Sequence, residues 1–299
     1  MKRKVTLHGP ATLSVSLPTA WAKKHGVQKG DEIDVEEFRN CLKIITTKEK
    51  EGNFISIDLT GYLDITHRML SSIYKSGFDS LEVIYSAEEK KIVVDTINEE
   101  WIGFEIMEQS DKRISAQKVT EMSKEDVKAF VLRTFHFVHD MGNDCLQLIK
   151  DEKFDDLPSV VEKDTQVNKL TNFCRRAINK EILTGITKPG PLYFIAEELE
   201  KIGDAYKHIS QDKMENKEKV GKSLLEVFSL INTLLHDAQS MYSAFSLDKM
   251  KEFKEKQLSI QDALDKEISK KSDVKLLIEL NMLFELVFDL NGAIISISH

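Results

Sequence analysis

The chain has 299 residues, of which 41% are hydrophobic and 8% aromatic, and it carries a net charge of −8 at pH 7. This length favours two or three domains, and the apolar content excludes a wholly disordered chain because it is sufficient to build cores. The three cysteines lie far apart without a CxxC pair, which argues against a disulfide framework and a thiolate zinc site.

The charge is unevenly distributed along the chain. The first thirty residues contain six bases and no acid, and the first fifty sum to +4, so the remaining 249 residues carry −12. A basic N-terminal segment followed by an acidic remainder indicates a module that binds a polyanion, joined to a region of different function. The N-terminal stretch MKRKVTLHGP lacks the apolar run of a signal peptide, and no window approaches 18 uncharged apolar residues. We therefore expect a cytoplasmic protein without membrane insertion.

The first region ends near residue 50 and is predicted to contain four short strands and one short helix. Leu13, Val15 and Leu17 alternate with serines in a strand that Pro18 ends, and the helix TAWAKKHG follows, closed by Gly26. The strands EIDVEE and CLKIIT come next. Fifty residues with these elements bury too small a core to be stable alone, so the region is expected to pair with a second copy as a homodimer.

This region resembles a known DNA-binding family. The run TLSVSLPTAWAKKHGVQKGDEIDVEE is similar to the swapped-hairpin domain of the AbrB/SpoVT/MazE type. The resemblance implies a small interleaved dimeric β-barrel over residues 1–50 that binds double-stranded DNA. The residues it places at the DNA are Lys2, Arg3, Lys4, His8, Thr12 and Ser14.

One departure from that family changes the expected mode of binding. The loop LHGPATLS has no charge, whereas bacterial regulators of the family often carry arginines in the hairpin. Contact between the basic residues and phosphates is therefore expected rather than base-specific contact. The alternative is a solvated basic tail on a domain that only dimerises.

The second region, residues 52–121, is predicted to be an α/β module. FISIDL and LEVIYS read as strands around a helix, LDITHRMLSSIYKSG, that Gly77 ends. SAEEKKIVVDTINEEW is predicted to be a helix, with Ser86 as its N-cap and Glu89 at the capping-box position. GFEIMEQ and RISAQKV are predicted to form a hairpin. No phosphate loop, metal cluster or nucleophile is present, so a spacer or dimer-stabilising role is the default expectation.

The third region, residues 123–299, is predicted to be an all-α bundle of two three-helix repeats. The six helices are expected over 123–152, 159–184, 191–212, 215–247, 250–271 and 273–297. Three landmarks recur in the same order in the two halves: an His-Asp step (VHDMGND, LHDAQSM), KEI, and ExxxD. The fold class is therefore multidomain α+β.

Several of these helices carry carboxylates on one face. In LEKIGDAYKHI, Ile202 and Tyr206 lie on an apolar stripe, whereas Glu200, Asp204 and His208 lie opposite. Such stripes are usually solvated faces, but carboxylates from several helices are also the ligands that divalent or ferric ions prefer. Spacing alone leaves both interpretations open.

The same stretch carries a second resemblance. LEKIGDAYKHI is similar to the signature of PhoU proteins, the regulators of phosphate uptake, and FELVFDLNGAI is a weaker copy. The resemblance covers residues 123–299 and implies that E/DxxxD pairs bind metal ions of the Zn, Fe, Mn or Mg type, with no organic cofactor. The implied ligands are Asp140, Asp144, Glu200, Asp204, Glu285 and Asp289. Gly203 is expected to let a neighbouring helix approach closely.

Together these features predict an archaeal-type, PhoU-like transcription regulator of phosphate homeostasis, with DNA and the phosphate ABC transporter as partners. The alternative is a dimeric adaptor that regulates the transporter without binding DNA. An enzyme is the weakest hypothesis, because di-metal oxidation chemistry in a bundle needs an ExxH step on paired helices and no helix here has one on its acidic face.

Overall fold

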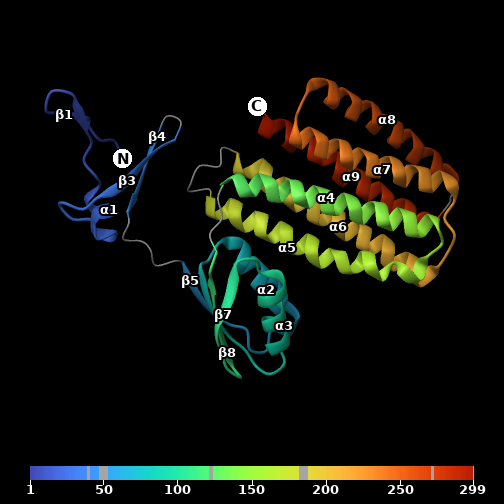
Figure 1. Cartoon of the computed structure of the whole chain (residues 1–299), viewed down its shortest axis with the longest axis horizontal. Helices are drawn as coiled ribbons and strands as arrows, with labels where there is room; N and C mark the ends of the chain where they lie inside the picture. The colour runs from blue at the N-terminus through green and yellow to red at the C-terminus, as the bar shows by residue number, and fades with distance from the viewer. Residues whose placement is uncertain (39–40, 47–52, 121–123, 182–187, 271–272, 299) are drawn as a thin grey trace. The chain divides into compact units, whose positions relative to one another are not determined.

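The computed structural model describes the chain except for residues 39–40, 47–52, 121–123, 182–187, 271–272 and 299 (Figure 1). The chain divides into two compact units, Met1–Phe54 and Ile55–His299. The predicted boundaries near residues 51 and 122 lie outside the described residues. The predicted α/β module and helical bundle both lie in the second unit.

The first unit consists of two hairpins and a short helix. Its elements are β1 (Thr6–His8), β2 (Thr12–Ser14), α1 (Thr19–Lys24), β3 (Ile33–Phe38) and β4 (Cys41–Thr46). β1 pairs with β2 and β3 with β4, both antiparallel, in two separate sheets. Gly26 has a positive φ of 62°, as expected for the residue that ends the helix. The described residues of one chain do not close a barrel.

The second unit begins with an α/β module whose sheet has the strand order β5-β6-β8-β7. Gly77 ends α2 in the left-handed conformation, with φ of 94°. The module's core includes Leu70, Val83, Trp101 and Ile114. Its elements are β5 (Phe54–Asp58), α2 (Leu63–Ser76), β6 (Ser80–Ile84), α3 (Lys90–Asp95), a π-helical turn (Thr96–Glu100), β7 (Phe104–Gln109) and β8 (Arg113–Lys118).

The start of α3 differs from the prediction. The Ser86 N–H and hydroxyl both donate to the Glu89 carboxylate, at 2.9 and 2.6 Å, as in a capping box. Regular helix begins at Lys90, although the Lys90 N–H already donates to the Ser86 carbonyl at 3.2 Å, as in a helical turn. Glu89 is fully buried, and its other carboxylate oxygen accepts the Gly61 N–H at 3.0 Å. The carboxylate therefore also ties this turn to the loop after β5.

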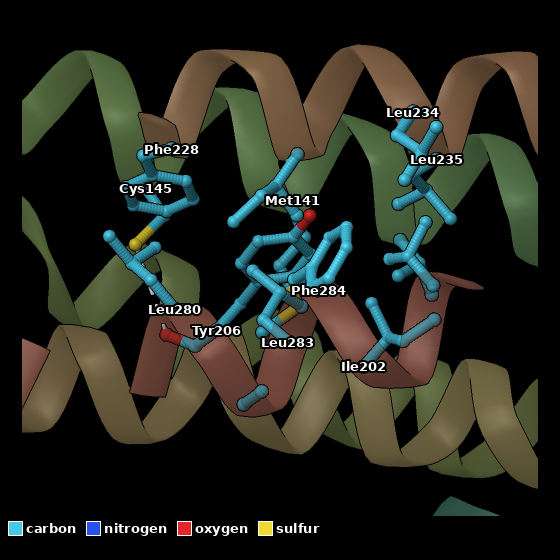
Figure 2. Packing of buried hydrophobic residues seen from close by; sticks show 14 of the residues in the cluster. Met141, Cys145, Ile202, Tyr206, Phe228, Leu234, Leu235, Leu280, Leu283 and Phe284 are labelled. Carbon is cyan, nitrogen blue, oxygen red and sulfur yellow. Dashed lines mark hydrogen bonds between the residues drawn. The ribbon is translucent and has the colours of Figure 1, made fainter. Parts of the chain in front are cut away.

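The bundle has six helices near the predicted places, but the helix predicted over 215–247 begins only at Lys222, because α6 continues to Asn216 and ends at Lys217 with a positive φ of 50°. The described residues between Lys124 and Ser298 form α4 (Lys124–Lys150), α5 (Pro158–Glu181), α6 (Pro189–Asn216), α7 (Lys222–Ser243), α8 (Leu247–Lys270) and α9 (Val274–Ser298). Figure 2 shows the core in which α4, α6, α7 and α9 meet around Met141, Tyr206, Leu235 and Phe284. α9 is long and apolar enough to cross a membrane by length and composition, and its buried residues belong to this core.

Two glycines set how closely the helices of the first repeat pack. A Cβ on Gly203 of α6 would lie 2.9 Å from Val167 Cγ1 of α5, which confirms the packing role expected for this glycine. A Cβ on Gly142 of α4 would lie 2.5 Å from Tyr206 Cζ, so this second glycine makes room for a tyrosine ring. Both close contacts involve a residue of α6.

In the second repeat, larger residues stand at the positions that correspond to Gly203 and Val167. Phe288 precedes Asp289 as Gly203 precedes Asp204, and Phe253 lies thirteen residues before its KEI lysine, as Val167 does. Phe253 is fully buried and Phe288 half-buried. Accordingly α5 packs extensively on α6, whereas α8 packs chiefly on α7 and little on α9.

The α/β module is bound to α5 through the end of α2. The Arg176 guanidinium donates to the backbone carbonyls of Tyr74 (2.8 Å) and Phe78 (2.7 Å), and the Asn179 amide donates to that of Lys75 (2.8 Å). These bonds reach the last turn of α2 and the residue after its Gly77 cap, and the Tyr74 carbonyl accepts the Gly77 N–H at 3.2 Å as well. At the corresponding positions α8 has Asp262 and Asp265, which when ionised cannot donate.

We expect Gly203→Ala to be less stable than Gly292→Ala by about 1–3 kcal/mol, the usual cost of overpacking. Both changes gain helix propensity, but only the first puts a methyl group against Val167, since nothing lies within 4 Å of a Cβ on Gly292. Urea unfolding measures the difference. In a Val167→Ala background the difference between the two alanine variants should be smaller. Equal stabilities of Gly203→Ala and Gly292→Ala in the wild-type background would contradict the packing role of Gly203.

Replacing Arg176 by Met should loosen the α/β module from the bundle, at a cost of about 2–4 kcal/mol for two lost charge-assisted hydrogen bonds. Hydrogen exchange at the amides of 74–78 should speed up while that of the α7 core stays slow. Asp262→Asn, at the matching exposed position of α8, is the control and should change neither the stability nor the exchange of the amides of 74–78. Unchanged exchange in the Arg176 variant would show that other contacts hold the module.

Candidate functional site

The β1–β2 hairpin has one polar and one apolar face. Thr6 pairs with Ser14 and His8 with Thr12, so these side chains share a face, and the Thr6 and Ser14 hydroxyls lie 3.0 Å apart in a hydrogen bond. Leu7 and Leu13 pair on the other face. The residues predicted to contact DNA are all exposed: Lys2, Arg3, Lys4, His8, Thr12 and Ser14. His8, Thr12 and Ser14 lie together on the polar face.

The apolar side of the first unit is uncovered. Leu7 is 66% and Leu13 70% exposed, and no hydrophobic side chain in the described part of this unit is buried. A unit of this size without buried hydrophobic side chains lacks a core of its own. The further exposed large hydrophobic residues of the unit are Met1, Val5, Val15, Val35, Leu42 and Phe54.

The acidic stripe of α6 is paired with bases of the same chain. The Arg175 guanidinium, only 1% exposed, lies 2.5 Å from the Glu197 carboxylate and 3.9 Å from that of Glu200. The Lys207 ammonium lies 2.8 Å from Asp204 and 2.7 Å from Asp164 of α5. The stripe therefore faces α5 and its bases and is not a freely solvated surface.

Burial and crowding change the proton affinity of two of these acids. Burial raises the pKa of Glu200, and the neighbouring Asp204 and Glu197 raise it further, against the opposing effect of Arg175. Burial likewise raises the pKa of Asp164, against the hydrogen bond from Lys207. The two bases thus hold carboxylates charged where burial disfavours the charge.

The other predicted metal ligands are scattered. Asp144 of α4 pairs with Lys163 of α5, and Asp140 is exposed. Glu285 and Asp289 of α9 are both exposed. Within the described part of the chain, no three His, Cys, Asp or Glu side chains lie close enough to hold one metal ion.

A metal ion at Glu200 and Asp204 would have to displace Arg175 and Lys207, and within the described part of the chain these acids belong to no group of three possible ligands. Metal binding by Glu285 with Asp289, or by Asp140 with Asp144, stays a prediction. The buried Arg175 was missed in the sequence. Its signal is an arginine in the apolar register of α5, four residues after buried Thr171 and three before buried Ile178.

No known protein-family model matches the chain, and no curated protein matches it. Among solved structures, the chain is similar to a putative PhoU-like phosphate regulatory protein from Shewanella oneidensis MR-1, with 14% identity, a TM-score of 0.39, and coverage of 56% of this chain and 96% of that one. It is also similar to a PhoU-like protein of the same organism, with 13% identity, a TM-score of 0.32, and coverage of 60% and 95%. Likenesses this distant carry no conclusion about function.

Replacing Arg175 by Gln should destabilise the chain by about 1–3 kcal/mol, because it leaves Glu197 and Glu200 without their counter-charge. Lys163→Gln removes a more exposed ion pair and should cost about 1 kcal/mol or less. Thermal and urea unfolding at pH 7 measure both. If both variants lose less than about 1 kcal/mol of unfolding free energy, the acidic stripe of α6 behaves as a solvated surface.

Proposed function

We propose that the chain is a dimeric, DNA-binding transcription regulator of phosphate uptake. The observation that supports DNA binding most directly is the β1–β2 hairpin: an exposed apolar face, an exposed polar face and a basic N-terminal segment. A second copy that covers Leu7 and Leu13 would provide the core that the unit lacks on its own. Two basic segments would then be held on one particle.

DNA binding in this proposal is electrostatic. Lys2, Arg3 and Lys4 are exposed, and the residues near them on the polar face are neutral. Bases of this kind neutralise phosphates and position a protein on the duplex without reading its sequence. His8 and Thr12, at the end of the hairpin, are the side chains available for contact with base edges.

The phosphate-uptake half of the proposal rests on the resemblance of LEKIGDAYKHI to the PhoU signature. α6, which carries this stretch, contacts α4, α5 and α9, and α5 in turn binds the α/β module. A transporter component that bound the bundle would therefore act on the helix at its centre. In this proposal the α/β module, fixed to α5, connects the bundle with the DNA-binding unit in the chain.

The second candidate is a dimeric adaptor of the phosphate transporter that does not bind DNA. The uncharged loop LHGPATLS between and around β1 and β2 favours it, because an interface with DNA usually concentrates positive charge. In that case the first unit only brings two bundles together. Both candidates need the dimer, so DNA affinity and its dependence on salt distinguish them.

We expect the chain to sediment as a dimer and to bind duplex DNA of many sequences. If each subunit neutralises about three phosphates, the slope of log K against log salt is about −5. Fluorescence anisotropy at several salt concentrations measures this slope. Replacing Lys2, Arg3 and Lys4 together by Ala should bring it close to zero.

The matched control replaces three exposed lysines of the bundle, Lys217, Lys219 and Lys251, by Ala and so removes the same charge. It should leave the slope near −5. A dimer without measurable DNA affinity at low salt favours the adaptor. A monomer at micromolar concentration would contradict both candidates.

A further inference from the structure

Two histidines meet where the two repeats of the bundle adjoin. His139 of α4 and His236 of α7 have ring centroids 5.3 Å apart, with their planes inclined at 49°. They occupy the same place in the recurring His-Asp step, VHDMGND in one repeat and LHDAQSM in the other. The contact between α4 and α7 thus brings the corresponding imidazoles of the two repeats together.

The surroundings of this histidine pair are polar and well ordered by hydrogen bonds. The buried Tyr206 hydroxyl donates to Asn232 Oδ1 at 2.8 Å, and the Asn232 amide donates to Asn143 Oδ1 at 3.3 Å. Asn143 Nδ2 lies 3.4 Å from the His139 ring. These contacts link α6, α7 and α4 and fix the helices that carry the two imidazoles.

A second contact between an imidazole of α4 and a polar side chain of α7 lies one turn away. The amide of buried Gln239 lies 2.8 Å from His136 Nδ1. His136 therefore has a partner on α7, whereas His236 makes no hydrogen bond among the residues that the structure describes. His236 is exposed and His139 half-buried, so the pair is open to solvent on one side.

The separation of the rings suits a shared metal ion. Metal–nitrogen bonds of about 2.0–2.1 Å at a tetrahedral angle place two imidazole centroids about 5 Å apart. Imidazole is a preferred ligand of Cu, Ni and Zn. Asp140, next in sequence to His139, is exposed and adds negative charge on this side, whereas Asp237, next to His236, is paired with Lys256 at 2.5 Å. Since no third acidic, Cys or His side chain among the described residues joins the pair, water would complete the coordination.

We propose that His139 and His236 form a two-histidine site for a transition-metal ion that bridges the two repeats. The site differs from the carboxylate pairs in ligand type, and it takes one imidazole from each repeat, whereas Asp140 and Asp144 both lie on α4. Its preference follows the general order of divalent ions, Cu²⁺ above Ni²⁺ and Zn²⁺, and it does not take Mg²⁺, which requires oxygen ligands. A bound ion would join α4 to α7, and the proposal stands independently of DNA binding.

The test is titration of the untagged full-length chain with Cu²⁺ and Zn²⁺, followed by calorimetry and thermal unfolding at fixed pH. We expect one bound ion per chain and a higher melting temperature. Pulsed electron paramagnetic resonance of the Cu²⁺ complex should show two imidazoles. His236→Gln should lower the affinity at least about tenfold, remove one imidazole and abolish the rise in melting temperature.

His236 is exposed, so its glutamine variant should fold, which circular dichroism checks. The matched control is His208→Gln, an exposed histidine of α6 that should leave affinity and spectrum unchanged. Affinity unchanged in His236→Gln, or a spectrum with one imidazole in the wild type, would overturn the proposal. So would a loss of binding in Glu285→Gln with Asp289→Asn, because it would place the ion on α9.

Discussion

The close approach of α5 to α6 at Gly203 determines the arrangement of the second unit. Because Gly203 has no side chain, Val167 of α5 lies where a Cβ would be. At this spacing the buried Arg175 reaches the carboxylates of α6, and Lys207 reaches acids on both helices. The neighbouring Arg176 points instead to α2 and binds the α/β module. Two successive arginines thus serve two different interfaces of one helix.

The same contact explains why two similar repeats behave differently. In the second repeat Gly203 and Val167 are replaced by Phe288 and Phe253, and α8 packs far less on α9 than α5 does on α6. α8 also has acids in place of the arginine and asparagine that hold α2. Consequently α5 binds the α/β module, while the residues of α8 at the equivalent positions, Asp262 and Asp265, are exposed. The divergence needs few residues because each one acts at a helix–helix contact.

Charged side chains have different surroundings in the two units. In the bundle, carboxylates and bases from neighbouring helices form ion pairs, and burial raises the pKa of Glu200 and Asp164 against the opposing effect of Arg175 and Lys207. In the first unit the bases are exposed and the apolar residues are uncovered as well. A surface that combines both is suited to a second copy and a polyanion at once. The bundle is internally complete, whereas the first unit is not.

Most helices and strands could be predicted from the sequence, because hydrophobic periodicity, glycine caps and proline positions are local properties. The six bundle helices, Gly77 as the end of α2 and the core stripe of Ile195, Ile202 and Tyr206 were predictable for this reason. The DNA contacts remain a prediction from a motif. Which charges meet depends on the packing of the helices, since Arg175 and Glu197 lie 22 residues apart on different helices. The same holds for the bond from the Gly61 N–H to the Glu89 carboxylate and for the contact between His139 and His236. Spacing along the chain carries no information about contacts between distant elements.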